Sequence, residues 1–175
     1  MKNELRKFAI EKRKTLNCRE LSKKTMHNLF LLPEYRASRN LICYYPLKYE
    51  IDTTECLSDK SKKIYLPRVK GNSMEICPMG KMRSGCYGIM EPQTEAVNDY
   101  SESDIVIIPA CAADEKGFRL GYGKGFYDRF LPLLPKTCIK IVLVYSCLLF
   151  ESVFPDKYDV KADIIVSDER ILKIM

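Results

Sequence analysis

Histidine and metal-binding cysteine pairs are nearly missing from this chain. His27 is the only histidine in 175 residues, and the eight cysteines include no C-x-x-C pair. A zinc site therefore has few ligands to draw on. Eight cysteines in a small secreted protein would suggest disulfides, but the N-terminus here gives no sign of secretion. Cys43 and Cys111 lie in apolar surroundings, so we expect reduced residues of the core.

Long apolar segments are also missing. No apolar run reaches the roughly 18 residues that span a bilayer. The first six residues, Met1 to Arg6, are charged and contain no apolar signal-peptide core, and the acidic Glu4 and Glu11 are untypical of a transit peptide. We therefore expect a cytoplasmic protein that does not associate with membranes.

Charge of one sign is in moderate excess. The net charge is +6, the apolar fraction is 46%, and lysine and arginine are spread along the chain. The densest basic cluster is in the first fourteen residues: Lys2, Arg6, Lys7, Lys12, Arg13 and Lys14. Such a surface attracts nucleic acids, but it attracts polyanionic small molecules such as ATP equally well.

The apolar pattern predicts alternating helices and strands. Residues 2–15 favour a helix that buries Leu5, Phe8, Ala9 and Leu16. Asn17 and Glu20 form a capping box for a second helix, which Pro33 limits. A strand is expected over 40–45, a third helix from Asp52 or Thr53 to about Lys63, and a hairpin of 64–69 with 73–77. Residues 80–100 read as irregular.

Two β-branched runs, 105–109 and 139–145, flank a loop and a helix, and 164–166 forms a last short strand. A strand, a helix and a second strand in this order predict a parallel crossover. We therefore expect a single three-layer α/β domain over residues 1–175, Rossmann-like, with a mostly parallel sheet and helices on both faces. Its ligand site should lie beyond the carboxyl ends of the strands.

The most informative segment is the glycine-rich run from Arg119 to Arg129, RLGYGKGFYDR. Alternating glycines let backbone amides approach an anion closely, and a helix from about Gly125 through Leu134 adds its positive dipole end. Lys124 supplies a mobile charge, and Asp128 falls in the helix's first turn. The run is neither the dinucleotide fingerprint nor a P-loop, so ATP would be bound here by a different device. A plain tight turn is the structural alternative.

This run resembles the signature of the 5-formyltetrahydrofolate cyclo-ligase family, also called 5,10-methenyltetrahydrofolate synthetases. Only Phe126 differs, since the family has tyrosine there. Further blocks resemble the family's in the same order: KNELR at 2–6, YP at 45–46, EIDT at 50–53, LPRV at 66–69, GIMEP at 88–92 and DIVIIP at 104–109. The chain departs from the family at Ala113, which replaces phenylalanine, and at Tyr158, which replaces histidine.

The resemblance implies a ligase that converts 5-formyltetrahydrofolate and ATP into 5,10-methenyltetrahydrofolate, ADP and phosphate, with Mg²⁺ as cofactor. It implies Asp128 and Asp159 as metal ligands, and Tyr45 and Glu50 as folate contacts. The ATP-binding residues that it implies are Lys2, Arg6, Arg119, Leu120, Gly121, Tyr122, Gly123, Lys124, Gly125, Phe126 and Tyr127. Arg68 is a weaker candidate for folate or phosphate and is left out of this set.

Two other functions remain open from the residues alone. A sugar-phosphate isomerase or deaminase of related architecture would need an acid–base pair but neither ATP nor Mg²⁺. A basic nucleic-acid-binding module would need base-stacking aromatics on a basic face. Lys2, Arg6 and Lys124 fit one phosphate pocket better than an extended groove, so we expect small-molecule substrates, no nucleic-acid partner and a monomer.

Overall fold

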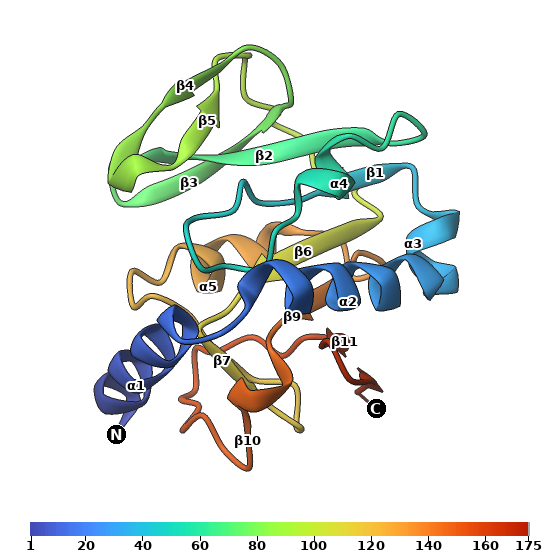
Figure 1. Ribbon diagram of the computed structural model, residues 1–175. Coiled ribbons are helices and arrows are strands. Elements are labelled where there is room, and N and C mark those ends of the chain that lie inside the picture. The colour runs from blue at the N-terminus through green and yellow to red at the C-terminus, as the bar shows by residue number, and fades with distance from the viewer. Residues whose placement is uncertain (175) are drawn as a thin grey trace.

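A seven-stranded sheet forms the centre of the computed structural model, which describes residues 1–174 (Figure 1). Its strand order is β12-β11-β9-β6-β1-β2-β3. The bounds are β1 Asn40–Ile42, β2 Lys63–Lys70, β3 Ser73–Pro78, β6 Ile105–Pro109, β9 Ile139–Leu143, β11 Ile164–Val166 and β12 Ile171–Lys173. The five inner strands are parallel, and β3 and β12 join the edges antiparallel. The expected mostly parallel sheet is confirmed.

The middle of the sheet is the core. Ile105, Ile107, Ile141 and Val142 are fully buried, as expected for apolar strands that are covered on both faces. β6 pairs with β9 in parallel, so the predicted crossover through the glycine loop and its helix is confirmed.

Helices cover both faces of the sheet. Their bounds are α1 Lys2–Lys14, α2 Cys18–Leu31, α3 Pro33–Ala37, α4 Thr54–Leu57 and α5 Phe126–Phe130. The chain runs from β1 to β2 in one direction across the sheet and from β6 to β9 in the other. Right-handed crossovers in opposite directions put α4 and α5 on opposite faces. Figure 1 agrees, with α2 and α4 in front of the sheet and α5 behind it.

The first two helices begin largely as the sequence predicts. The Asn17 side chain caps α2 by accepting a hydrogen bond from the Glu20 N–H at 3.3 Å. The expected buried stripe of α1 is wrong in one place, because Phe8 is 53% exposed and packs only edge-on against Phe150. Arg13 is buried instead, since it donates to the Tyr122 hydroxyl in the glycine loop and to the Ala110 carbonyl.

Several element lengths differ from expectation. α4 ends at Leu57 rather than near Lys63, and α5 ends at Phe130, where Pro132 allows only a 3₁₀ turn over Leu131–Leu133. The strands expected to reach residues 45 and 145 end at Ile42 and Leu143.

Residues 80–100 are not wholly irregular. They contain a small hairpin of β4, Met82–Ser84, and β5, Met90–Pro92, joined through a 3₁₀ turn at Cys86–Gly88. Three residues per strand are too few for a recognisable alternation, so the sequence pattern missed it. A third sheet orders β10 Leu149–Phe150, β7 Ala112–Asp114 and β8 Arg119–Leu120, and it supports the start of the glycine loop.

The topology itself creates the crevice. Neighbouring β1 and β6 lead away in opposite directions, which makes the gap beyond their carboxyl ends the switch point of the sheet. Tyr44 and Tyr45 follow β1 there, and Pro109 ends β6. Within residues 1–174, no helix is long and apolar enough to cross a membrane.

Candidate active site

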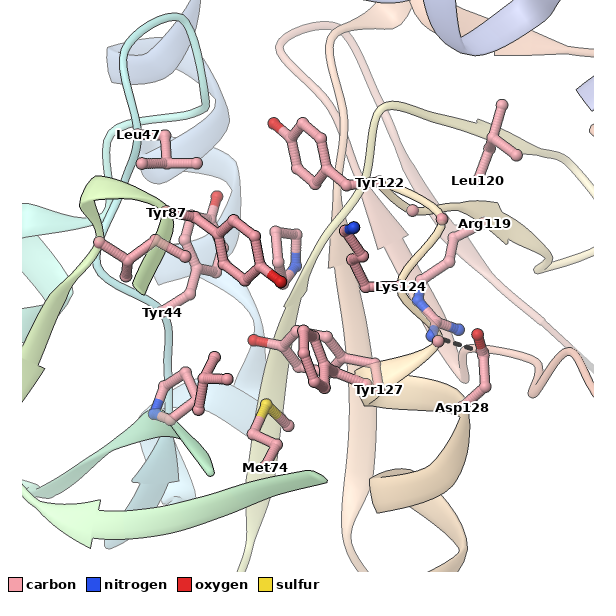
Figure 2. Close-up of a pocket in the computed structure, with 18 of the residues that line it drawn as sticks. Tyr44, Leu47, Met74, Tyr87, Arg119, Leu120, Tyr122, Lys124, Tyr127 and Asp128 are labelled. Atoms are coloured by element: carbon pink, nitrogen blue, oxygen red, sulfur yellow. Dashed lines mark hydrogen bonds and ion pairs between the residues drawn. The ribbon is translucent and has the colours of Figure 1, made fainter. Parts of the chain in front are cut away.

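One cavity of about 300 Å³ opens at this switch point. It contains every residue that the sequence nominated for ATP, folate or metal: Lys2, Arg6, Tyr45, Glu50, all of 119–127, Asp128 and Asp159. Figure 2 shows Tyr44, Tyr87, Tyr122, Tyr127 and Lys124 around its central space. Residues up to 157 positions apart in sequence therefore meet, which supports one site without testing their individual roles.

The glycine loop has the backbone that its sequence requires. Gly123 has φ 89° and Gly125 has φ 65°, a left-handed region that is costly for other residues. A Cβ on Gly123 would also lie 3.3 Å from Cζ of Arg6. A side chain at Gly123 has no room because the guanidinium of Arg6, on α1, packs against the loop at this point.

Helix α1 is attached to the cavity through two basic side chains. Arg6 Nε donates to the Gly121 carbonyl at 2.7 Å, and Lys2 Nζ donates to Asp159 Oδ2 at 2.6 Å and to Asp156 Oδ2 at 2.9 Å. Burial alone would lower the pKa of Lys2, but hydrogen bonds to the two carboxylates outweigh it and the pKa is raised. Lys2 therefore stays charged at the cavity edge.

The two carboxylates proposed as metal ligands are each held by a cation. Arg119 Nη2 donates to Asp128 Oδ1 at 2.7 Å, as the dashed line in Figure 2 marks, and Lys2 holds Oδ2 of Asp159. Within residues 1–174, Asp128 Oδ2 and Asp159 Oδ1 have no hydrogen-bond partner. Two carboxylates with a free oxygen each suit Mg²⁺, which completes its shell with phosphate oxygens and water. No group of three or more potential ligands exists in that range, so the donor set fits such shared binding rather than an all-protein cage.

A partly buried network joins the glycine loop to Glu50. The Tyr122 hydroxyl donates to Glu50 Oε1 at 2.7 Å and accepts from Arg13 Nη1 at 3.0 Å. The Leu47 N–H donates to Glu50 Oε2 at 2.7 Å. Burial, reinforced by the Glu50 charge, raises the pKa of Tyr122, so the phenol keeps its proton and can donate. Arg13 also donates to the Ala110 carbonyl.

Tyrosines surround the rest of the cavity. Tyr44 donates to the Ile51 carbonyl at 3.0 Å, which fixes the segment between β1 and Glu50. Burial raises the pKa values of Tyr44 and Tyr127, so both rings remain neutral. Tyr87 has φ 59° and lies 5.6 Å, ring centroid to Nζ, from Lys124.

Several residues in or beside the cavity were not predicted. Arg13 does not line the cavity but donates to Tyr122, and it was counted only as surface charge because its partners lie about a hundred positions away. Tyr87 and Glu91 belong to the β4–β5 hairpin, which the pattern missed. The GIMEP block at 88–92 was the one signal that could have pointed to Glu91.

The remaining candidates lie outside the cavity. Arg68 is held by Glu75 and by the carbonyls of Pro92 and Thr94, so it ties the hairpin to the sheet. Tyr158 is 71% exposed. Asp114, in the block that departs from the family, is fully buried and caps the N–H groups of Lys116, Phe118 and Val153.

An α/β fold with a glycine-rich loop, two carboxylates and a cavity at the switch point is typical of nucleotide-dependent enzymes. The chain belongs to the 5-formyltetrahydrofolate cyclo-ligase family, whose model matches residues 1–168. It is thus an ATP-dependent ligase of folate one-carbon metabolism. Family membership decides against the isomerase, deaminase and nucleic-acid alternatives.

Individual proteins similar to this chain support the same family assignment. A 5-formyltetrahydrofolate cyclo-ligase of Haemophilus influenzae is 32% identical over 148 residues, which is 78% of this chain and 79% of that protein. A solved structure of 5,10-methenyltetrahydrofolate synthetase from Aquifex aeolicus has a TM-score of 0.87 and 35% identity, and the match covers 99% of this chain and 92% of that one. The Mycoplasma pneumoniae synthetase has a TM-score of 0.78 at 26% identity, with 95% of this chain and 98% of that one covered.

Proposed function

We propose that the chain, as a single domain over 1–175, cyclises 5-formyltetrahydrofolate to 5,10-methenyltetrahydrofolate through a phosphorylated formyl oxygen. An N-formyl oxygen is a poor leaving group, and N10 is a weak nucleophile toward an amide carbon. Transfer of the γ-phosphoryl group to that oxygen makes the carbon iminium-like. N10 then attacks within the same molecule, its proton is lost, and phosphate leaves, with ADP as the other product.

The phosphate end of the cavity supports the first step. Lys2, Arg6 and Lys124 bring three positive charges from α1 and the glycine loop to one place. Phosphoryl transfer needs positioning and charge neutralisation more than covalent help from the protein. Arg6 can grip phosphate oxygens with its guanidinium fork, while Lys2 and Lys124 act as point charges.

Magnesium would be held by Asp128 and Asp159 together with the triphosphate, where it supplies charge neutralisation of the phosphate oxygens. Arg119 and Lys2 hold these two carboxylates in place at the cavity through ion pairs. Because each aspartate already shares one oxygen with a cation, the free oxygens are the ones left for a metal.

The folate would lie at the other end, against Tyr45 and Glu50. A reduced pterin carries N–H donors along one edge, which a carboxylate can accept in pairs. Both oxygens of Glu50 are oriented by Tyr122 and Leu47, and each keeps a further lone pair. This arrangement would fix the pterin so that N5 and N10 face the phosphate end.

The observation that carries the proposal is that all the nominated residues line one cavity. The test is the appearance of methenylfolate absorbance when purified protein meets 5-formyltetrahydrofolate and ATP. We expect the signal to vanish when either ATP or Mg²⁺ is omitted. No product from folded protein with both present would reject the proposal. A monomer in sedimentation is the accompanying expectation.

A further inference from the structure

Glu91 is a buried carboxylate in the cavity that none of the roles above uses. The residue is only 3% exposed, yet it is part of the cavity lining. Its Oε1 accepts a hydrogen bond from the Val69 N–H at 3.0 Å, while Oε2 has no hydrogen-bond partner within residues 1–174. A carboxylate that is taken out of water and left half-satisfied is costly unless a ligand completes it.

The surrounding chain is shaped around this carboxylate. A Cβ on Gly85 would lie 2.0 Å from Glu91 Oε2, so only glycine at that position leaves room for it. The buried side-chain atoms without a partner in the described chain are Arg13 Nε, Glu34 Oε2 and Asn40 Oδ1. Glu91 Oε2 is not one of them, so this oxygen is not fully sealed, and Glu91 is part of the cavity lining.

No neighbouring cation neutralises Glu91 directly. Arg68 lies near Glu91, but its donors go to Glu75 and to the carbonyls of Pro92 and Thr94. An anionic phosphate would be repelled. The missing partner is therefore a hydrogen-bond donor.

The position of Glu91 indicates which ligand that is. Val69, its anchor, lies on β2, which pairs with β1, and the segment after β1 carries Tyr45 and Glu50. The cavity residues on this side are apolar and will be called the apolar wall: Pro67, Val69, Met74, Tyr87 and Ile89. The phosphate-binding cations come instead from α1 and the glycine loop.

We propose that Glu91 is a second acidic anchor for the folate, accepting an N–H of the reduced pterin from the side opposite Glu50. The inference rests on the proposed function. A reduced pterin offers several N–H donors and can engage two carboxylates, whereas adenine offers only its single amino group. Two acids would favour the reduced pterin, which carries ring N–H groups that an oxidised one lacks.

The test compares Glu91→Gln with Glu95→Gln. Glutamine keeps an acceptor for the Val69 N–H but replaces the free oxygen with a donor, which a pterin N–H opposes. Glu95 is exposed and outside the cavity, so its variant is a matched control. We expect Glu91→Gln to weaken 5-formyltetrahydrofolate binding at least about tenfold by titration calorimetry, with the affinity for a non-hydrolysable ATP analogue within about twofold of wild type.

Unchanged folate affinity in Glu91→Gln would overturn the inference, and so would a larger loss for the ATP analogue than for folate. Glu91→Asp keeps the charge but withdraws it by one methylene, so it should lose less folate affinity than Glu91→Gln. The reverse order would mean that shape, not charge, matters and would also overturn it. Wild-type protein that makes no methenylfolate would instead reject the proposed function, so the two failures are distinguishable.

Discussion

The carboxylates at the two ends of the cavity have different hydrogen-bond partners. At the phosphate end, Asp128 and Asp159 are paired with Arg119 and Lys2, so the protein supplies both signs itself. At the folate end, Glu50 and Glu91 are held by neutral donors, namely Tyr122, Leu47 and Val69. Under the proposed function, the two aspartates of the first arrangement would bind the metal, and Lys2 would bind the nucleotide phosphates. In the second, no cation donates directly to either carboxylate, although Arg13 and Arg68 lie nearby. Under the proposed function, this difference would let one pocket distinguish a polyanion from a pterin.

The largest effect should follow from removing charge at the phosphate end. Asp128→Asn keeps the shape and an acceptor for Arg119 but loses the charge that would compensate Mg²⁺. We expect turnover to fall on the order of 10²-fold or more, with the fold intact. The measurement is the methenylfolate rate over a range of Mg²⁺ concentrations, with circular dichroism as the folding check. Near-normal activity at limiting Mg²⁺ would remove the aspartate from the metal site.

Asp159→Asn should act in the same direction but more mildly. Asp156 provides a matched control, since it also accepts from Lys2 Nζ but is not part of the cavity lining. Asp156→Asn should therefore leave the Mg²⁺ dependence nearly unchanged. Equal effects of the two variants would mean that Asp159 acts only by holding Lys2.

Arg6→Ala should weaken ATP specifically. It removes a charge-assisted phosphate contact and the hydrogen bond to the Gly121 carbonyl, and each charge-assisted bond contributes roughly 1.5–3 kcal/mol. We expect the KM for ATP to rise at least about tenfold, with little change in melting temperature because Arg6 is outside the core. Lys7→Ala, one residue along and exposed, is the control. If the affinity for a non-hydrolysable ATP analogue is unchanged, Arg6 does not contact ATP and this face of α1 is only a solvated surface.

Glu50→Gln tests the opposite end. The amide keeps one acceptor and the shape, but it loses the charge that attracts pterin N–H groups. We expect the KM for 5-formyltetrahydrofolate to rise about tenfold and that for ATP to change little. Normal folate affinity combined with weaker ATP binding would assign Glu50 to the nucleotide and reverse the comparison.

The phosphate end could be predicted from sequence because most of it is contiguous. Residues 119–128 form one loop whose glycines determine its backbone, and this local signal survives folding. Asp159 and Glu50 came from the resemblance to the family, since neither has a local pattern that marks it. The sheet was predictable because buried parallel strands are apolar without interruption.

What failed depended on distant partners. Arg13 is buried only because Tyr122 and the Ala110 carbonyl receive its donors, and no helical periodicity encodes that. Phe8 was expected in the core by the same periodicity, yet α1 turns another face inward. Glu91 lies on a three-residue strand, too short to be recognised. Sequence patterns thus predict what a segment does alone, and they miss roles that contacts between segments create.

The smallest effect expected concerns Tyr122, where the two ends meet. Its hydroxyl makes the only hydrogen bond between the glycine loop and Glu50 within residues 1–174, and it also accepts a hydrogen bond from Arg13. Tyr122→Phe keeps the ring but removes this hydrogen bond. Its acceptor is a carboxylate, but Tyr122 is 42% exposed, so we expect the bond to contribute only about 0.5–1.5 kcal/mol. We therefore expect folate to bind a few-fold more weakly. We also expect the binding of folate and the binding of ATP to depend less on each other. The measurement is the affinity for an ATP analogue with and without folate. The ratio of these two affinities should move toward one in the variant, whereas Tyr158→Phe, exposed and outside the cavity, should leave it as in wild type. If Tyr122→Phe keeps the wild-type ratio, the two ends act independently and the hydroxyl serves only to orient Glu50.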